Sequence, residues 1–586
     1  MSRLKRMRGA LALLAAFVAG CGWLGGDSAL TSNDSLLRYV PADTPYVVAA
    51  VEPLPDAIAD LFAQQTSLAR NMIELGMQNA LAELGDADLP GGQGPASGAP
   101  GEEALAILTE LTSPEMFEAS GINRDSTSVL YGFGLLPVLR VTLAEGHDFE
   151  RVLDRLETLI ELESNATIET GSVAGLEYRY ITADQARFVI ALLENELVAT
   201  VVPTSFGDAE LPSVLGLVLP EQSIADSGRL ETIAEEYGFT ASMVGLLDVE
   251  RITSTFLDEP TATDAALLDL LGYDAELTNA VCRNEIRGLA GVAPLMVGGY
   301  TELNADTIAT TFVVELREDI AEGLARIPTS VPGLGAVTDA LLSFGMSFDI
   351  PAAREFVAAR LDAIEADPFE CEALAGIREL VPTIRIYLNQ PLPPVVESFT
   401  GFSATMDFDD IVFASPSPAP TGMEFTVLIA TDDAAGALAM ASALDPEIAA
   451  LDLRTDGQIT ELEMPGGLTG PMLNPFGPTF FVATETEIGV GLGPSGEARL
   501  EELMRSPAGD PSTFLRISLD LAAYYGLLAD TMGELALIDP DAPPPAAIAS
   551  MAEMMRGLQA IYSRETADFR FTERGVEIPV RFDLVP

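Results

Sequence analysis

The chain has 586 residues and a net charge of −58, because 89 acidic residues face only 31 basic ones. A surface this acidic repels nucleic acids and anionic headgroups, so we expect neither as a partner. Adaptation to high salt is one alternative explanation of the acidity. With 48% hydrophobic residues and a mean hydropathy of +0.27, the chain can bury sizeable cores in more than one domain.

Residues 1–20 have the three zones of a secretory signal peptide. Four basic residues stand within the first eight, and an uncharged apolar run from Gly9 to Gly20 follows them. This run is too short to cross a bilayer, which takes about 20 residues. The next residue is Cys21, the position on which the location of the protein depends.

The segment Val18-Ala19-Gly20-Cys21 resembles the lipobox of bacterial lipoproteins, in which an aliphatic residue and two small residues precede the acceptor cysteine. The resemblance implies cleavage before Cys21, a diacylglyceryl group on its sulfur and acylation of the new amino group. Several acyl chains make a durable membrane anchor. The alternative is an ordinary signal peptide, with Cys21 an unmodified thiol.

Residues 21–35 are rich in Gly, Ser, Asn and Asp and are expected to form a lipidated tether, which contains the only tryptophan, Trp23. In Gram-negative lipoproteins an Asp after the cysteine commonly retains the protein in the inner membrane. Here that residue is Gly22. The resemblance therefore implies the outer membrane, with the protein facing the periplasm; exposure at the cell surface is the alternative. No later apolar run reaches membrane-spanning length without a charge or a turn residue.

The rest of the chain indicates a duplication, with a first half at 36–327 and a second half at 328–586. In each half, strands run into amphipathic helices and alternate with hairpins, and each half is expected to pack its helices on antiparallel hairpins. The fold class is therefore α+β. Four strand-to-helix segments carry this pattern: YVVAAVEPLPDAIADLF from Tyr46, SMVGLLDVERITSTFL from Ser242, FGMSFDIPAAREFVAARL from Phe344 and FLRISLDLAAYYGLLAD from Phe514.

The phrase LLRYVPADTPYVVAAVEPLP, from Leu36, resembles the opening of uncharacterised secreted bacterial proteins that begin with V/L-P-A-D-T. This resemblance covers one phrase and the general order of elements, and it implies no active site. Loops are expected at 89–102, 416–421 and 540–545, where Gly, Pro and Ser cluster.

Two cysteines remain in the body of the protein, Cys282 and Cys371. An even pair in an oxidising compartment predicts a disulfide, which would join the two predicted halves. Closing a loop of about 90 residues would contribute on the order of 4 kcal/mol in the chain-entropy model. Two buried reduced thiols are the alternative.

Residues needed by many catalytic sites are missing. Lys5 is the only lysine and lies in the signal, so the body has no Walker lysine, Schiff-base lysine or Ser-x-x-Lys nucleophile. The only histidine, His147, excludes multi-histidine metal sites. It stands in AEGHDFERVL at a predicted helix start, where we expect an exposed first-turn residue rather than the base of a catalytic triad.

Three further patterns are interpreted as structural. Gly491, Gly493 and Gly496 match GxGxxG, but Pro494 removes an amide, so we expect a strand-to-helix turn and no dinucleotide cofactor. The acidic clusters 407–410 and 432–433 lack the spacing of a calcium loop and indicate solvated charge. A helical stripe is expected to be core rather than a lipid groove; its members are Ile548, Met551, Met555, Leu558 and Tyr562.

These observations predict an envelope-anchored lipoprotein with a non-catalytic binding or scaffolding role near the membrane, in contact with an envelope protein or an apolar ligand. No cofactor, metal or catalytic residue is expected. One alternative is a carrier that holds lipid or another apolar ligand between the two halves. The other is a hydrolase that uses only Asp and Glu, for which two close carboxylates would have to share a cleft.

Overall fold

A computed structural model of the chain describes most of the residues after the predicted tether. They form two compact units: unit 1 comprises the described residues up to Asn279 together with Leu295–Ala305, and unit 2 comprises Ala280–Pro294 and Asp306–Pro586. The description covers residue 30, residues 35–61 except 53, residues 106–107 and 110–111, and residues 113–586 apart from 165–166, 184, 208, 259, 274–278, 337, 409, 415–416, 452, 463–476 and 539–544.

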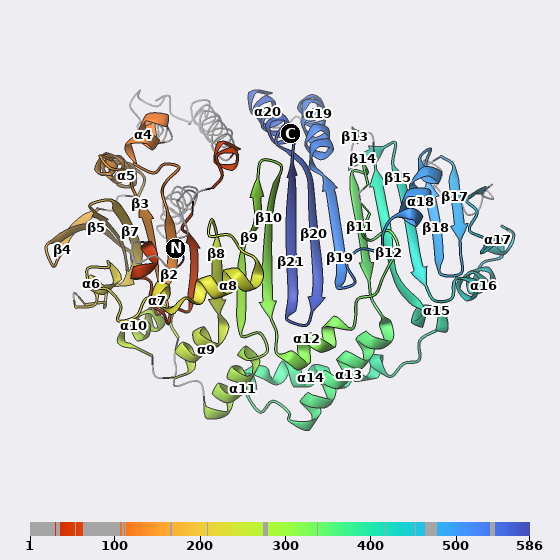
Figure 1. The fold of residues 1–586 in the computed structure, drawn as a ribbon, viewed down its shortest axis with the longest axis horizontal. Coiled ribbons are helices and arrows are strands. Elements are labelled where there is room, and N and C mark those ends of the chain that lie inside the picture. Colours follow the sequence, from red (N-terminus) through yellow and green to blue (C-terminus); the bar gives the residue numbers. More distant parts are fainter. Residues whose placement is uncertain are drawn as a thin grey trace, which may run out of the picture. The chain divides into compact units, whose positions relative to one another are not determined.

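Unit 1 contains an antiparallel sheet with the described strand order β4-β5-β6-β7-β3-β2-β1-β8-β9 (Figure 1). Its described elements are η1 (Leu36–Tyr39), β1 (Tyr46–Ala50), α4 (Pro114–Ala119), β2 (Ser128–Phe133), β3 (Leu136–Thr142), α5 (Phe149–Ser164), β4 (Glu169–Val173), β5 (Leu176–Ala183), β6 (Ala186–Leu193), β7 (Glu196–Pro203), α6 (Leu211–Val214), α7 (Ile224–Ser227), α8 (Arg229–Tyr237), β8 (Val244–Asp248), α9 (Val249–Leu257), α10 (Ala262–Leu270) and β9 (Leu295–Asn304).

The strands of unit 2 pair in the antiparallel order β10-β21-β20-β19-β11-β12-β15-β18-β17-β16, and β13 and β14 form a separate hairpin. Its strands are β10 (Thr307–Glu315), β11 (Leu342–Ser347), β12 (Phe399–Asp407), β13 (Asp410–Ala414), β14 (Ser417–Thr421), β15 (Glu424–Thr431), β16 (Thr460–Leu462), β17 (Thr479–Ala483), β18 (Glu487–Leu492), β19 (Thr513–Asp520), β20 (Tyr562–Thr572) and β21 (Gly575–Leu584).

The helices of unit 2 follow individual strands or link them. They are α11 (Ala280–Ala290), α12 (Glu318–Ala325), α13 (Ile350–Ala366), η3 (Glu372–Leu374), α14 (Ala375–Leu388), α15 (Pro394–Glu397), α16 (Ala434–Leu444), α17 (Pro446–Ala449), α18 (Gly496–Arg505), α19 (Leu521–Ile538) and α20 (Pro545–Gln559).

An aspartate marks three of the predicted strand-to-helix turns. Asp248 at the end of β8, Asp349 two residues after β11 and Asp520 at the end of β19 each accept a hydrogen bond from the backbone N–H three residues later. A side-chain oxygen in this position satisfies one of the free amides of the first helical turn. The sequence pattern of a β-rich run followed by Asp therefore fixes where each strand ends and its helix begins.

The α+β class and its antiparallel hairpins are as expected from the sequence, whereas one predicted break is wrong. Residues 417–421 lie in β14, which pairs with β13 although it contains Pro418 and Pro420. Proline is tolerated here because both strands of a two-stranded hairpin are edge strands. The N–H that proline lacks is not needed at positions where it would point away from the partner strand. The chain passes between the two compact units at residues 279–306.

One face of the unit 1 sheet is a closed core. Val47, Val129, Tyr131 and Val138 on this face are completely buried. The residues that face them come from the short helices η1, α6, α7 and α8 and include the buried leucines and isoleucine Leu37, Leu211, Ile224 and Leu230. On the opposite face, α5 packs Phe149 and Leu153 against Val141 and Leu197 of β3 and β7.

The corresponding core of unit 2 is built from the segment before β11 and from α18. Val331 and Leu334 pack with Ala430 of β15, and Ala336 packs with Leu428 and with Leu503 of α18. Among the helices that the structure describes, none is both long enough and apolar enough to cross a membrane.

Candidate functional site

The predicted lipidation site Cys21, and the tether that follows it, lie outside the described residues. The predicted loop at 89–102 also lies outside them, as do Asp409 and most of 540–545. Cleavage and acylation at Cys21 therefore stay predictions.

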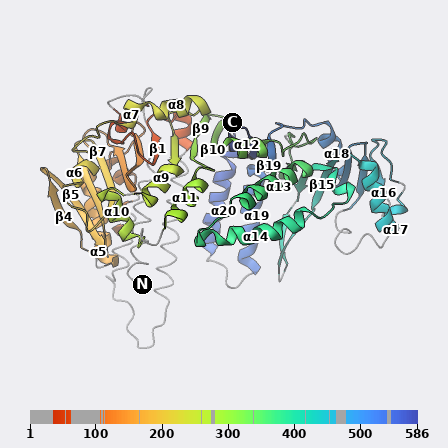
Figure 2. The same ribbon diagram turned by 90° about the horizontal axis from the view of Figure 1, so that it is seen from below.

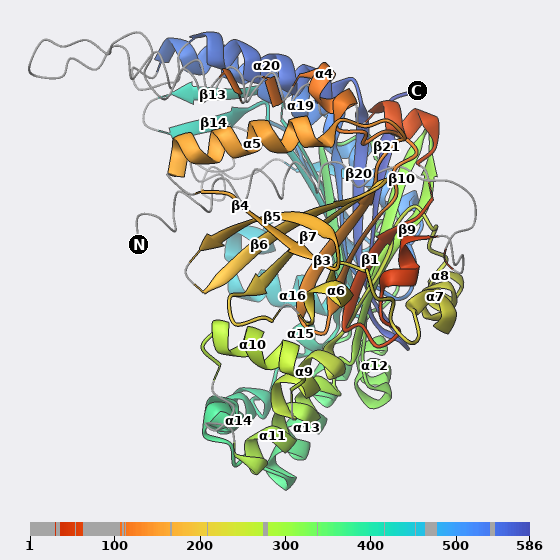
Figure 3. The same ribbon diagram turned by 90° about the vertical axis from the view of Figure 1, so that its left-hand side faces the viewer.

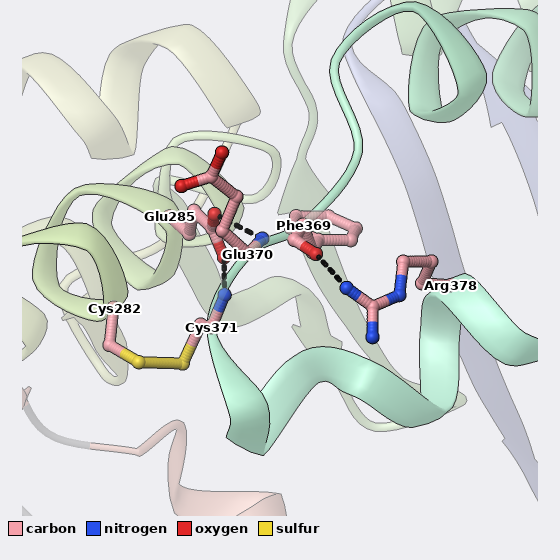
Figure 4. The surroundings of a disulfide bond; sticks show 6 residues. All are labelled: Cys282, Glu285, Phe369, Glu370, Cys371 and Arg378. Atoms are coloured by element: carbon pink, nitrogen blue, oxygen red, sulfur yellow. Dashed lines mark hydrogen bonds between the residues drawn. A yellow bond between two sulfur atoms is a disulfide. The ribbon is translucent and has the colours of Figure 1, made fainter.

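Cys282 and Cys371 form a disulfide across a sequence separation of 89 residues (Figure 4). Both residues are buried; Cys282 lies on α11 and Cys371 immediately before η3. The carboxylate of Glu285, on α11, accepts hydrogen bonds from the backbone N–H of Glu370 at 2.7 Å and of Cys371 at 3.0 Å. Bridge and carboxylate together hold α11 to the start of α14, and both cysteines belong to unit 2.

His147 lies two residues before α5 and is partly buried, so the predicted exposed position in the first helical turn is wrong. Its Nε2 is 3.0 Å from the carbonyl oxygen of Glu194, and its Nδ1 accepts a hydrogen bond from the N–H of Phe149. These contacts make Nε2 the protonated nitrogen and join two turns. With both ring nitrogens occupied by backbone groups, the histidine is not placed as a general base.

The glycine-rich segment 491–496 is the turn between β18 and α18. Strand β18 is antiparallel to both of its neighbours, whereas a dinucleotide-binding turn follows a parallel strand. The backbone N–H of Ser495 donates to a carboxylate oxygen of Glu424 at 3.1 Å. The carboxylate of the chain itself thus occupies the place where a phosphate would accept from this turn.

The acidic clusters that the sequence singled out are engaged by the protein. Asp407 accepts from the N–H of Leu341 at 2.8 Å and forms an ion pair with Arg499 at 3.2 Å. Asp433 caps α16 by accepting from the N–H of Gly436. Among the residues that the structure describes, no group of three or more His, Cys, Asp or Glu side chains is arranged to hold a metal ion.

Four members of the predicted methionine stripe lie on α20, which packs against α19. Tyr562 is instead the first residue of β20, so the predicted helical stripe is wrong at this position. Ile548 and Ala552 are buried, whereas Met551, Met555 and Leu558 are partly exposed. The stripe therefore contributes to the contact between two helices, as the core interpretation expected.

A buried arginine in unit 1 was not found by sequence reasoning. Arg140 has no exposed surface, forms an ion pair with Glu196 at 3.2 Å, donates to the hydroxyl of Tyr131 and stacks over Tyr39 with 3.9 Å between guanidinium carbon and ring centroid. Glu196 also accepts from Arg38 and from the Tyr39 hydroxyl. All partners are protein groups, so the cluster stabilises the fold and leaves no side open to a substrate.

One face of the sheet in unit 2 carries apolar side chains that are partly exposed. We call it the unit 2 apolar face. Strand registers place its members opposite one another, and each of them is partly or fully exposed. Phe312 is 50% exposed and Ile517 is 40% exposed, although both stand in the middle of paired strands. The face comprises Phe312 of β10, Ile578, Val580 and Phe582 of β21, Ala567 and Phe569 of β20, Leu515, Ile517 and Leu519 of β19, and Leu342, Phe344 and Met346 of β11.

The opposite face of the same strands is polar and internally paired. Arg564 binds Asp520 at 3.2 Å, Arg570 binds Asp568 at 2.7 Å, and Arg581 binds Asp583 at 2.7 Å. Part of this polar face is itself buried, since Asp568 and Ser518 are buried residues. On the apolar face, by contrast, Phe312 and Ile517 keep 50% and 40% of their surface exposed.

Helices of unit 2 stand at both ends of the apolar face. Figures 2 and 3 show α19 and α20 at one end of β20 and β21 and α13 and α14 at the other, projecting to the same side of the sheet. Helix α19 contacts β19 and β20, and α12 contacts β20 and β21, yet Phe312 and Ile517 remain 50% and 40% exposed. The helices therefore flank the exposed apolar residues without covering them.

Unit 1 has a smaller surface of the same kind, which we call the unit 1 apolar face. Val48 of β1 is directly opposite Leu130 of β2, and Leu247 of β8 is directly opposite Met296 of β9. These four side chains are between 36% and 46% exposed. Two cross-strand apolar pairs exposed side by side on one sheet are unusual for a surface in contact only with water.

A further exposed apolar stripe runs along α14. Ile377, Leu380, Ile384 and Tyr387 are spaced by three, four and three residues, and their exposed fractions run from 37% to 67%. This is the spacing at which one helix presents a seam to another. On the inner side of α14, Arg385 is held by Asp362 at 2.6 Å, which fixes the orientation of the stripe.

Sequence reasoning missed the apolar faces, although one signal was present. The alternation in LRISLD of β19 and FGMSFD before α13 distinguishes an apolar face from a polar face. The same alternation occurs whether a helix covers the apolar face or leaves it open, so the exposure could not be inferred.

Comparison of the chain with protein-family models, with curated proteins and with solved structures finds no match.

Proposed function

We propose that the protein is a non-catalytic envelope lipoprotein that binds an apolar chain, such as the acyl chain of a lipid, on the unit 2 apolar face. The observation that supports this function is the exposure of Phe312 and Ile517 among the apolar residues of five adjacent strands. Binding surfaces for small apolar ligands are lined mainly by aliphatic and aromatic side chains, which is the composition of this face.

The energetics favour a bound chain over bare contact with water. Removing apolar surface from water contributes about 25 cal/mol per Å², so covering several aliphatic and aromatic side chains would contribute several kcal/mol before the costs of binding. An extended acyl chain presents only methylene groups, which need no hydrogen bonds from the sheet. A predicted acyl anchor at Cys21 would keep the face close to a source of such chains.

We also propose that the two predicted halves arose by duplication. Unit 1 uses the order β8-β1-β2-β3-β7-β6 and unit 2 the order β19-β11-β12-β15-β18-β17, and each strand has the same place in its half. Within unit 2, the last strands of the two halves, β10 and β21, pair along their whole length. Each half would then have contributed an apolar sheet face.

Competition with an apolar fluorescent probe tests the binding function. N-phenyl-1-naphthylamine should bind the purified protein with increased fluorescence and be displaced by 1-dodecanol. Ile517→Glu places a charge at the centre of the face and should reduce probe binding about tenfold or more. Leu444→Glu is the matched control, because Leu444 is 79% exposed at the end of α16, outside the face. Equal binding by both variants would contradict the proposal.

A mass measurement tests the proposed anchor. Protein extracted from membranes should have a mass that begins at Cys21 and includes acyl chains, and Cys21→Ala should abolish both the added mass and the membrane association. Fractionation of inner and outer membranes then locates the protein. An unmodified Cys21 in a soluble protein would overturn the anchor while leaving the apolar face to be tested separately.

The stripe on α14 supports a second role, the docking of a helical segment of an envelope protein. A photo-reactive residue in place of Ile384 should give one discrete cross-linked product in cells, and Leu380→Asp should abolish it. The same residue in place of Leu444 controls for chance collisions, since Leu444 is exposed but lies outside the stripe. Identical cross-linking at both positions would contradict docking on α14.

A further inference from the structure

One charged residue, Glu565 of β20, lies on the same side of the sheet as the unit 2 apolar face. It lies directly opposite Leu519 of β19 on one side and Phe582 of β21 on the other. Ala567 is the next residue along β20 on the same face. A carboxylate therefore stands at the end of an otherwise apolar surface, flanked by an aliphatic and an aromatic side chain.

The acids on the opposite face of the same strands differ from Glu565 in their partners. Asp520, Asp568 and Asp583 each have an arginine within 3.2 Å, and Glu577 accepts from the hydroxyl of Thr572 at 2.9 Å. No residue that the structure describes forms an ion pair or hydrogen bond with Glu565. The arginines of these strands form ion pairs on the polar face, and Glu565 on the apolar face has no arginine partner.

The surroundings of Glu565 disfavour its charge. Partial burial raises the pKa of this carboxyl. Burial also raises the pKa of the Tyr525 hydroxyl of α19, with smaller contributions from Tyr562 and from the charge of Glu565. Tyr562, whose ring packs against Phe582 at 5.8 Å, lies at the same end of the face. A partly desolvated carboxylate next to aromatic rings is an environment that a cation would stabilise.

We propose that the ligand of the unit 2 apolar face carries a cationic group at one end, and that Glu565 binds this group. This inference rests on the proposed function, because the apolar part of the ligand has to occupy the face. A protonated amine would supply the missing ion-pair partner, and the adjacent tyrosine rings suit a cation. The net charge of −58 also favours a cationic over an anionic ligand. An apolar surface with one polar group at its end would fix the direction in which the chain lies.

Three amphiphiles with the same chain test the inference at neutral pH, each used below its micelle concentration: n-dodecylamine, 1-dodecanol and dodecanoate. Their displacement of N-phenyl-1-naphthylamine is measured on the wild-type protein, on Glu565→Gln and on Glu487→Gln. Glu487 is the matched control, because it is also a partly buried acid of unit 2 with a raised pKa, but it lies on β18, outside the defined face. Both substitutions remove one negative charge, so the bulk field of the protein changes equally.

The wild-type protein should bind dodecylamine in preference to dodecanol and dodecanoate. Glu565→Gln should weaken dodecylamine binding about tenfold, the size expected for one hydrogen bond to a charged group, and leave dodecanol binding unchanged. Glu487→Gln should behave as wild type. Equal effects of the two variants, or no effect of Glu565→Gln, would overturn the role of Glu565 while leaving the apolar site in place. Failure of all three amphiphiles to displace the probe would overturn the proposed function and this inference with it.

Discussion

Arg140 is the charged residue on which the core of unit 1 depends most. Its guanidinium group is completely buried and its charge is compensated by Glu196, which also binds Arg38 and Tyr39. Removing Glu196 would leave the buried guanidinium of Arg140 without a counter-charge, which costs far more than the pair itself contributes. The cluster therefore holds β3 to β7 only while all of its members are present.

Replacement of Arg140 by methionine should lower the free energy of unfolding of unit 1 by about 1.5–3 kcal/mol, because it removes the charged hydrogen bonds to Glu196 and Tyr131. Glu196 keeps Arg38 as a partner. Urea titration followed by near-ultraviolet circular dichroism measures the change. Arg505→Met is the control; Arg505 is 72% exposed in its pair with Glu501, and its loss should cost less than about 0.5 kcal/mol. Comparable losses for the two variants would show that Arg140 is not a structural centre.

The same scale gives a prediction for Glu565, whose pKa is raised by partial burial. Because the folded-state pKa lies above the unfolded value, the folded protein binds the proton more tightly, and this stability is present at low pH and lost as pH rises through the folded-state pKa. Glu565→Gln should therefore raise stability at neutral pH, by less than about 1 kcal/mol because solvent still reaches the carboxylate, and have no effect below the unfolded pKa. Urea titrations of wild type and variant at pH 7 and pH 3.5 measure this. A variant less stable than wild type at pH 7 would indicate a favourable partner for the carboxylate in the ligand-free protein.

At the scale of single elements, sequence and structure agree where a local chemical signal exists. Asp248, Asp349 and Asp520 follow β-rich runs and cap helices, so the turn positions could be predicted. The turn at 491–496 matches the dinucleotide-binding motif in sequence. In the structure its Ser495 N–H donates to the carboxylate of Glu424, 71 residues away in the chain. The partner of Arg140 and the exposure of Ile517 depend in the same way on pairings between distant strands, which periodicity does not specify.

The disulfide acts on two elements of unit 2, α11 and the start of α14. Replacing Cys282 and Cys371 together by serine should lower the stability of unit 2 by roughly 2–5 kcal/mol, because the bridge closes a long loop in the unfolded chain. Hydrogen exchange should show lost protection first in α11. Glu285→Gln in the intact disulfide form is the companion variant and should loosen only residues 370–371, since its carboxylate binds those amides. Unchanged protection of α11 in the double serine variant would mean that packing alone holds this helix.

At the scale of the molecule, the distribution of charge and of apolar surface are connected. With 89 acidic residues in the chain, each arginine is surrounded by an excess of possible carboxylate partners. The described arginines of β19–β21 form such ion pairs on the polar face. The apolar faces then have no basic side chains to screen them. The acidity is written in the sequence and the α+β class could be predicted from it, but the exposure of two apolar sheet faces could not.

The net charge of −58 should make stability depend on salt. Repulsion among the acidic residues opposes the compact state, and raising NaCl from about 0.05 M to 1 M shortens the screening length to about 3 Å, below the spacing of most surface charges. The melting temperatures of both units should therefore rise by several degrees. Sucrose at equal osmolality separates screening from general stabilisation, because it leaves the charges unscreened while still favouring the compact state. A rise with NaCl that exceeds the rise with sucrose would establish repulsion as a cost of this sequence, and unfolding at low salt would identify the acidity as an adaptation to high salt. Equal rises would mean that the acidic surface is already neutralised by its arrangement in the fold.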